Sequence, residues 1–247
     1  MKRSVLFMAV LVLLMPVSRC LAEDCGSVVV HYHERIPYAH STGNSVEGLT
    51  ATPADSAFKK SRVPFEWKNT PSKRQMVIIE ENNGCDCAIG WFKNPDREKF
   101  AGFTRPLYQD KPQIALARAD NAKLHNGMTV DSVLSNPKFV LGIKDGYSYG
   151  SFLDGKILQH KPVTDGTTGE NINMLNKIHA GRFDYFFIAP EEAESLIESS
   201  GLPKQDFQYV IFSDMPDGEK RYIMCSRKVG NEIIEKLNSA ISENEEK

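Results

Sequence analysis

One stretch of the chain, residues 84–98, combines aromatic side chains with an arginine in a pattern suited to binding a small anion. An apolar run predicts a short strand that ends in Trp91 and Phe92, and Arg97 follows at the start of a predicted helix. Strand ends and helix starts are where α/β sheets hold small anions, and a guanidinium can donate two parallel hydrogen bonds to a carboxylate. A solvated ion pair of Arg97 with a neighbouring acidic residue is the alternative interpretation.

The first 22 residues have the three-part layout of a cleaved secretory signal. Two basic residues precede an apolar run, Val5 to Met15, and a small-residue ending reaches Ala22. That run is shorter than the roughly 18 residues that a membrane span needs. A lipid anchor at Cys20 is the competing interpretation, and the bulky charged Arg19 before it disfavours that. We expect a soluble exported protein cleaved near Ala22.

The charge of the chain excludes two classes of partner. Cleavage removes Lys2, Arg3 and Arg19 from 30 basic residues, which leaves 27 basic against 32 acidic residues and a charge of −5. No basic run follows later in the sequence. Nucleic acid and anionic membranes are therefore poor partners for this chain.

The cysteines predict disulfides in an oxidising compartment. After cleavage the chain keeps four of them, at Cys25, Cys85, Cys87 and Cys225. Cys85 and Cys87 are too close in sequence to bridge each other without strain, so each is expected to pair with one of the other two, in either arrangement. A zinc site that includes His31 and His33 is the alternative. We expect no metal, because two clear ligand pairs at finger spacing are missing.

Predicted strands and helices alternate along the roughly 225 residues that remain after cleavage. The first half predicts strands at 28–33, 63–67 and 87–92, separated by helices that begin near Thr52 and Thr70. In the second half the predicted strands are at 139–143 and 185–188, and the helices begin near Thr129, Ser148, Ile172 and Pro190.

This alternation indicates an α/β protein with mostly parallel sheets covered by helices on both faces, arranged as two lobes. Segments 114–118 and 221–227 are expected to be strands that cross between the lobes. A helix at 229–241 is expected to pack back onto the first lobe.

Short motifs in a characteristic order link the chain to a known family. They are Arg35-Ile36-Pro37-Tyr38, Gly84-Cys85-Asp86, Asp96-Arg97-Glu98, Phe103 to Tyr108, Gly142 to Gly150 and Gly181 to Asp184. In this order and spacing the sequence resembles the type II periplasmic solute-binding proteins of the family that captures polar amino acids for ABC importers. The resemblance covers nearly the whole mature chain and implies a two-lobed fold with two hinge crossings. It implies a first lobe of residues 23–115 completed by 222–247, and a second lobe of residues 116–221.

The resemblance implies a ligand site between the lobes, with Arg97 matching the arginine that grips a ligand carboxylate. Strand alternation sends Trp91 and Phe92 to opposite faces, so one is expected in the cleft and the other in the core. The other expected ligand-binding residues are Tyr38, Arg35, Tyr147 and Ser148. Each has an alternative role: the tyrosines in packing, Arg35 as a solvated loop residue, and Ser148 as a helix N-cap.

One position departs from the family pattern. Amino-acid binders of the family place an aspartate for the ligand ammonium where this chain has Ala189. Glu191 or Glu34 is a possible substitute, and the other interpretation is a carboxylate ligand without an α-amino group.

We therefore expect a monomeric ligand-capture protein without a cofactor or catalytic residue, whose closed form docks on an ABC permease or a membrane receptor. An enzyme resembling cyclohexadienyl dehydratases is one alternative, with His31, His33, His40 or Glu34 as the general acid or base. A sensory or accessory binding protein without a transport role is the other.

Overall fold

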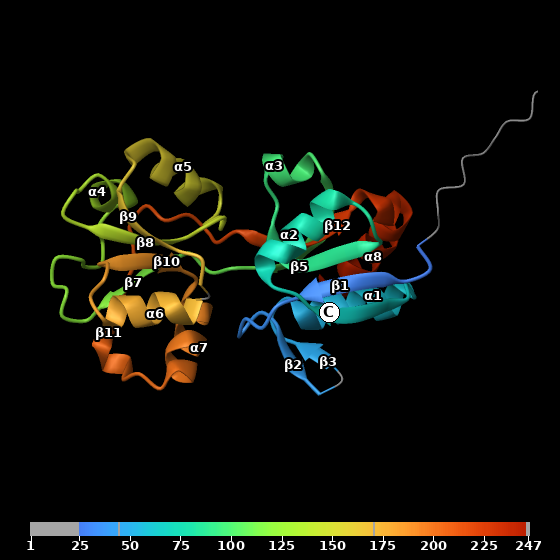
Figure 1. Ribbon diagram of the computed structural model, residues 1–247, viewed down its shortest axis with the longest axis horizontal. Coiled ribbons are helices and arrows are strands. Elements are labelled where there is room, and N and C mark those ends of the chain that lie inside the picture. Colours follow the sequence, from blue (N-terminus) through green and yellow to red (C-terminus); the bar gives the residue numbers. More distant parts are fainter. Residues whose placement is uncertain (1–24, 44, 170, 246–247) are drawn as a thin grey trace, which may run out of the picture.

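A computed structural model describes residues 25–245, except residues 44 and 170. The predicted signal segment, residues 1–22 with Cys20, lies outside the described residues. Two α/β lobes lie side by side along the long axis, and two chain segments run between them (Figure 1). Within the described residues, none of the helices combines the length and the apolar character that crossing a membrane requires.

The sheet of the first lobe has five strands in the order β4-β1-β5-β12-β6. They are β1 (Val28–Tyr32), β4 (Phe65–Asn69), β5 (Asp86–Phe92), β6 (Ala101–Gln109) and β12 (Lys220–Ser226). Strand β1 is parallel to β4 and β5, whereas β12 is antiparallel to both of its neighbours. Only β12 therefore runs against the other strands of this sheet, as the expectation of mostly parallel sheets requires. A small hairpin of β2 (His40–Thr42) and β3 (Ser45–Glu47) extends from this lobe.

The sheet of the second lobe has the order β11-β7-β10-β8-β9. Its strands are β7 (Ile114–Arg118), β8 (Val140–Lys144), β9 (Val163–Thr167), β10 (Tyr185–Ile188) and β11 (Phe207–Val210). Here β7 is the strand that runs against the rest. Each lobe thus receives its one reversed strand directly after a segment that crosses from the other lobe (Figure 1).

Helices cover both faces of each sheet, and each face has its own apolar core. In the first lobe α1 (Ala51–Ser61) and α8 (Gly230–Glu245) pack on one face and α2 (Ser72–Glu81) on the other. In the second lobe α4 (Val130–Leu134) and α5 (Ser151–His160) pack on one face, and α6 (Asn171–His179) and α7 (Pro190–Ser200) on the other. The remaining helices are α3 (Pro95–Glu98) and the 3-10 turns η1 (Lys204–Asp206) and η2 (Arg227–Val229).

Two predicted helix starts are displaced in the structure. Helix α1 begins at Ala51 rather than after Thr52, because the Thr50 hydroxyl donates to the carbonyl of Tyr38 and the Thr52 hydroxyl accepts from the Gly48 N–H. Helix α5 begins at Ser151 rather than near Ser148, since Gly150 adopts a positive φ of 94° just before it. Glycine tolerates that conformation because it has no Cβ.

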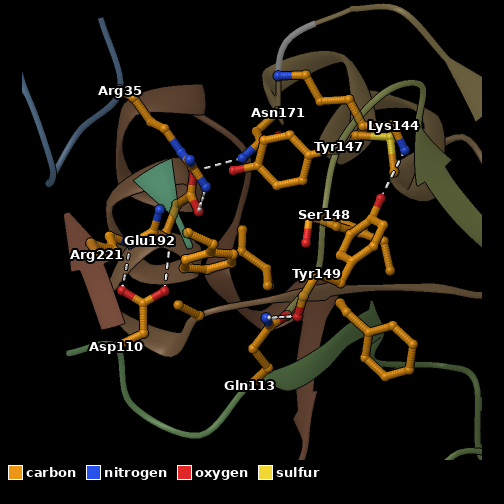
Figure 2. Close-up of a pocket in the computed structure, with 16 residues that line it drawn as sticks. Arg35, Asp110, Gln113, Lys144, Tyr147, Ser148, Tyr149, Asn171, Glu192 and Arg221 are labelled. Atoms are coloured by element: carbon orange, nitrogen blue, oxygen red, sulfur yellow. Dashed lines mark hydrogen bonds and ion pairs between the residues drawn. The ribbon is translucent and has the colours of Figure 1, made fainter. Parts of the chain in front are cut away.

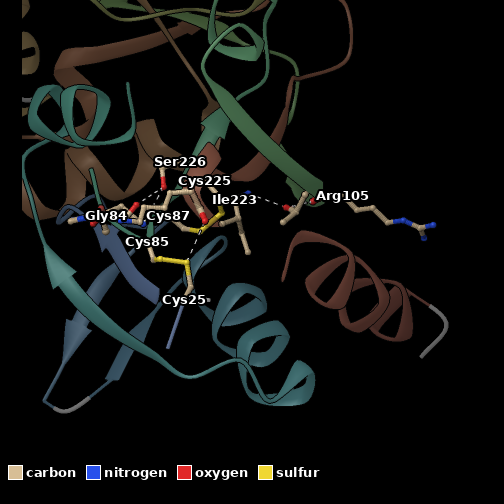
Figure 3. Close-up of a disulfide and its surroundings, with 12 residues drawn as sticks. Cys25, Gly84, Cys85, Cys87, Arg105, Ile223, Cys225 and Ser226 are labelled. Atoms are coloured by element: carbon tan, nitrogen blue, oxygen red, sulfur yellow. Dashed lines mark hydrogen bonds and ion pairs between the residues drawn. A yellow bond between two sulfur atoms is a disulfide. The ribbon is translucent and has the colours of Figure 1, made fainter. Parts of the chain in front are cut away.

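The expected disulfides are present, and their pairing is Cys25–Cys85 and Cys87–Cys225 (Figure 3). Cys87 and Cys225 face each other on the neighbouring strands β5 and β12 and are fully buried. Cys25 ties the start of the described chain to the residue before β5. Both bonds therefore fasten distant parts of the sequence to the central strand of the first lobe.

Replacing Cys25 and Cys85 together by alanine should lower the free energy of unfolding by about 2–4 kcal/mol, because this bond closes a loop that spans 60 residues. Urea unfolding without reductant measures the difference. The pair is only half-buried, so the substitution leaves the core largely intact. Equal unfolding free energies for the two proteins would contradict a stabilising role for this bond.

Candidate functional site

Two adjoining pockets lie between the lobes, at the ends of their central strands. Both pockets are lined by residues of the two lobes, and they share Arg35, Phe92, Tyr147, Ser148 and Arg221. Among the expected ligand-binding residues, six line these pockets, namely Arg35, Trp91, Phe92, Arg97, Tyr147 and Ser148. The structure therefore brings residues separated by more than a hundred positions to one interlobe cleft (Figure 2).

The segments that cross between the lobes are joined by a buried ion pair. Arg221, near the start of β12, donates two hydrogen bonds of 2.6 Å to the carboxylate of Asp110, which directly follows β6. A third Arg221 nitrogen donates to the carbonyl of Gly90 at 3.0 Å. The crossings also approach closely as backbones, because a Cβ on Gly218 would collide with the carbonyl of Asp110. The Arg221–Asp110 ion pair thus holds the two crossing segments together, and their close approach requires glycine at position 218.

A second ion pair spans the cleft from one lobe to the other (Figure 2). Arg35, in the loop after β1, donates to both oxygens of Glu192 on α7, at 2.6 and 2.7 Å. The Asn171 amide, at the start of α6, donates to the same carboxylate at 2.6 Å. Burial alone would raise the pKa of Glu192, but the guanidinium of Arg35 outweighs it and holds that pKa below its ordinary value.

The ring of Tyr38 contacts the guanidinium groups of both pairs. The ring centroid is 4.0 Å from the Arg221 guanidinium carbon and 4.9 Å from that of Arg35. Tyr38 is buried, and it lies behind the arginines instead of on the cleft wall. Aromatic faces attract cations, so Tyr38 helps to hold two like charges close together. Its place in the structure is that of a support for the two arginines.

Arg97 differs from the other cleft arginines because no carboxylate of the described residues lies within ion-pair distance of it. Helix α3 begins after Asn94, whose side chain accepts from the Arg97 N–H, and this cap fixes the backbone. The guanidinium donates to the carbonyl of Phe92 at 2.7 Å and lies over the Trp91 ring. Only 8% of the residue is exposed, and burial lowers the pKa of its guanidinium. Arg97 is therefore a buried cation that faces a pocket.

Trp91 and Phe92 both line the cleft, although alternation predicted only one of them there. Gly90 before them has a φ of 77°, and the pairing of β5 with β12 slips by one residue at Tyr222. This irregularity lies before Trp91, and Trp91 and Phe92 themselves pair in order with Tyr222 and Arg221. Both residues line the pocket because they end β5 at the cleft. The indole N–H of Trp91 donates to Gln75 at 2.9 Å, so the ring is fixed as well as exposed to the pocket.

The second lobe contributes a loop at the end of β8. Tyr147 lies 5.1 Å from the Arg35 guanidinium and 5.2 Å from the Lys144 ammonium, measured to its ring centroid. Ser148 donates its hydroxyl hydrogen bond to Asp154 on α5 at 2.5 Å, and Asp154 also accepts from the Tyr149 N–H. Ser148 is thus not the N-cap of α5, since the helix begins three residues later. In the structure the Ser148 hydroxyl also accepts a hydrogen bond from the Gly150 N–H. The same oxygen can accept a hydrogen bond from a ligand.

Four charged residues that line the site were not predicted from the sequence, namely Asp110, Lys144, Glu192 and Arg221. Glu191, named as a possible partner for an ammonium, instead accepts from the hydroxyl of Tyr108 and the N–H of Lys111. Glu34, the other candidate, accepts from the N–H of Ser41 at an exposed position. The position of Glu192 could have been predicted from helical spacing. It lies four residues before the half-buried Leu196 and therefore on the same face of α7.

The described residues contain no cluster of three or more histidine, cysteine, aspartate or glutamate side chains placed to hold a metal ion. His31 lies inside the first lobe, where its ring contacts Thr70 and Asp86 at 2.8 Å each. His33 lines the pocket that contains Arg97. His31 therefore lies in the core of the first lobe, whereas His33 lies on the cleft wall.

Comparison with known proteins relates the chain to one family and one fold. The model of bacterial extracellular solute-binding proteins, family 3, matches residues 28–247. A comparison with the curated proteins gave no significant match.

Three solved structures illustrate the similarity. An ancestral arginine-binding protein bound to arginine is 16% identical, with a TM-score of 0.70 and coverage of 90% of this chain and 93% of that one. A structure from work on glutathione import via GshT and the cystine ABC importer TcyBC of Streptococcus mutans is 11% identical, with a TM-score of 0.71 and 90% coverage of each chain. The arginine-, lysine-, histidine-binding protein ArtJ of Geobacillus stearothermophilus is 12% identical, with a TM-score of 0.70 and coverage of 91% and 90%. Identities this low show a shared fold.

Asp110→Asn should lower the free energy of unfolding by about 3–5 kcal/mol, because it leaves the buried guanidinium of Arg221 without a counter-charge. Urea unfolding measures the change. Asp120→Asn is the matched control, since Asp120 pairs with Arg118 on the surface and its loss should change stability little. Similar effects of the two substitutions would contradict the role given to the buried pair.

The Arg35–Glu192 pair should make stability depend on acid pH. The pKa of Glu192 is lowered in the fold from an ordinary value of 4.5, so its contribution is fully present above pH 4.5 and is lost as the pH falls through the lowered pKa. Glu192→Gln lacks this contribution. The difference in unfolding free energy between the two proteins should therefore shrink as the pH is lowered from 6 to 3 in a series of urea titrations. A difference independent of pH would contradict the ion pair.

Proposed function

The chain belongs to the bacterial extracellular solute-binding proteins of family 3, and from this premise we propose that it captures a small carboxylate-bearing solute between its lobes. The supporting observation is Arg97. Within the described residues it is a buried guanidinium in the cleft without a carboxylate partner, next to aromatic rings that can enclose a small molecule. A carboxylate that accepts from this planar group would supply the missing counter-charge.

The proposed ligand lies between Arg97 of the first lobe and the loop of Tyr147 and Ser148 of the second. These three residues line one pocket together with Trp91 and Phe92. A ligand that contacts both lobes stabilises the closed form and leaves the open form unaffected. Ligand binding is thereby coupled to closure, and no covalent chemistry is needed.

The proposed localisation and binding partner follow from the same family membership. The family and the two disulfides point to an exported protein. We propose that it is a periplasmic monomer after cleavage near Ala22, and that its closed form docks on the permease of an ABC importer. The closing units in this proposal are residues 23–115 with 222–247, and residues 116–221.

A second candidate function is catalysis on a carboxylate held in the same cleft, and His33 favours it. Its imidazole lines the pocket that contains Arg97, within reach of the same bound molecule. An imidazole can act as general acid or base near neutral pH. Chromatography of each bound compound after long incubation separates the two functions, because a capture protein returns its ligand unchanged.

Arg97→Gln should weaken binding of a carboxylate ligand about ten- to hundredfold, the loss expected for charge-assisted hydrogen bonds. Ligands are found with a thermal-shift screen of small carboxylates and amino acids, since binding raises the melting temperature by mass action. Titration calorimetry then gives the affinities.

Arg105→Gln is the control for this substitution, because Arg105 is exposed on β6 and its side chain points away from the disulfide-bonded strands (Figure 3). The control should bind the ligand as the unaltered protein does. An affinity that Arg97→Gln leaves unchanged would overturn the carboxylate-gripping role.

A further inference from the structure

The carboxylates on the cleft wall are already neutralised by the protein itself. Among the described residues, those that line the two pockets include two carboxylates, Asp110 and Glu192. Asp110 receives both of its charged hydrogen bonds from Arg221. Glu192 receives two from Arg35 and one from Asn171. A ligand ammonium group would have to displace an arginine from either of them.

A third carboxylate lies near the cleft and is also engaged. Asp154 accepts from the Ser148 hydroxyl at 2.5 Å and from the Tyr149 N–H at 2.8 Å, and so it fixes the loop. It does not line either pocket. Its negative charge is close enough to act on the guanidinium of Arg97. Asp154 therefore positions the loop and gives an ammonium no direct partner.

The wall beside Glu192 is apolar. Residues Phe186 to Ala189, at the end of β10, line the pocket together with Met174. Ala189 occupies the N-cap position of α7 and makes no side-chain capping bond. Nothing on this wall can accept a hydrogen bond from an ammonium through its side chain.

We propose, on the basis of the proposed function, that the cleft selects an organic anion without an ammonium group, a carboxylic acid rather than an amino acid. Arg97 supplies the binding charge, and each described carboxylate of the cleft already has its cation. Binding a zwitterion would bury an ammonium group without a counter-charge, which is costly in a site closed to water. Selectivity of this kind comes from the penalty imposed on the wrong ligand.

The test compares pairs of compounds that differ only in the α-amino group. The probes are three pairs: succinate and L-aspartate, glutarate and L-glutamate, and 3-phenylpropanoate and L-phenylalanine. Titration calorimetry on the whole mature protein at pH 7 should show that the acid of a binding pair has the higher affinity, by about tenfold or more. An amino acid that binds as tightly as its partner acid, or more tightly, overturns the inference and leaves the proposed capture function standing.

A substitution in the apolar wall gives the converse test. Ala189→Asp adds a carboxylate to the pocket at a helix N-cap, where aspartate is a favourable residue. It should shift the affinity ratio of a pair toward the amino acid by about tenfold. Ala189→Asn has nearly the same shape without the charge and should leave the ratio as it is. Equal ratios in both variants would overturn the inference that this wall sets the selectivity.

Failure of the proposed function gives a different result. In that case neither member of any pair binds, in the unaltered protein or in the Ala189 variants, and melting temperatures do not change. The inference then falls together with the proposal on which it rests. Binding of the acids that Arg97→Gln weakens about ten- to hundredfold, together with weak binding of the amino acids, supports both.

Discussion

The structure depends on the neutralisation of buried charge between its lobes. Two guanidinium groups, of Arg35 and Arg221, lie close to the Tyr38 ring, and each forms a bidentate ion pair. Removing ions from water costs several kcal/mol for each ion, so such groups persist only where their partners are placed correctly. Asp110 meets this condition within the hinge, whereas Glu192 meets it only when the second lobe approaches the first. The charge arrangement therefore specifies the hinge and the closed cleft together.

Arg97 differs from the two paired arginines in its electrostatic environment. Glu192 overcomes the effect of burial on Arg35, and Tyr38 followed by Asp110 overcomes it on Arg221, so the pKa of each guanidinium is raised. Burial lowers the pKa of Arg97. The same local chemistry would make Arg97 a surface ion-pair residue if α3 lay elsewhere. Its cap at Asn94 and its bond to the Phe92 carbonyl hold it in the cleft instead. Among the three cleft arginines, Arg35 and Arg221 have carboxylate partners, and the guanidinium of Arg97 has none within ion-pair distance among the described residues.

Sequence patterns predicted the fold better than the site, for a physical reason. Apolar runs placed strands such as 114–118 and 185–188 at their observed positions, because burial of a strand depends mainly on its own side chains. The pairing of Glu192 with Arg35 joins residues 157 positions apart in the sequence and depends on the angle between the lobes. Alternation predicted one of Trp91 and Phe92 in the cleft, whereas both line it because they end β5 at the interlobe pocket. The motifs of the resembled family did place Arg97, Tyr147 and Ser148 together, through their order alone.

The Arg35–Glu192 pair spans the cleft and therefore contributes to the contacts that hold the two lobes together. Opening would return both groups to water, which compensates for much of the lost attraction, so the pair sets a small free-energy difference between the states. A ligand can shift such an equilibrium only by its differential affinity for the closed form. The pocket of Arg97, Tyr147 and Ser148 provides that difference, because its walls come from both lobes and exist together only in the closed form. Specificity and closure consequently depend on the same three residues, while the ion pairs behind them fix the geometry in which those residues meet.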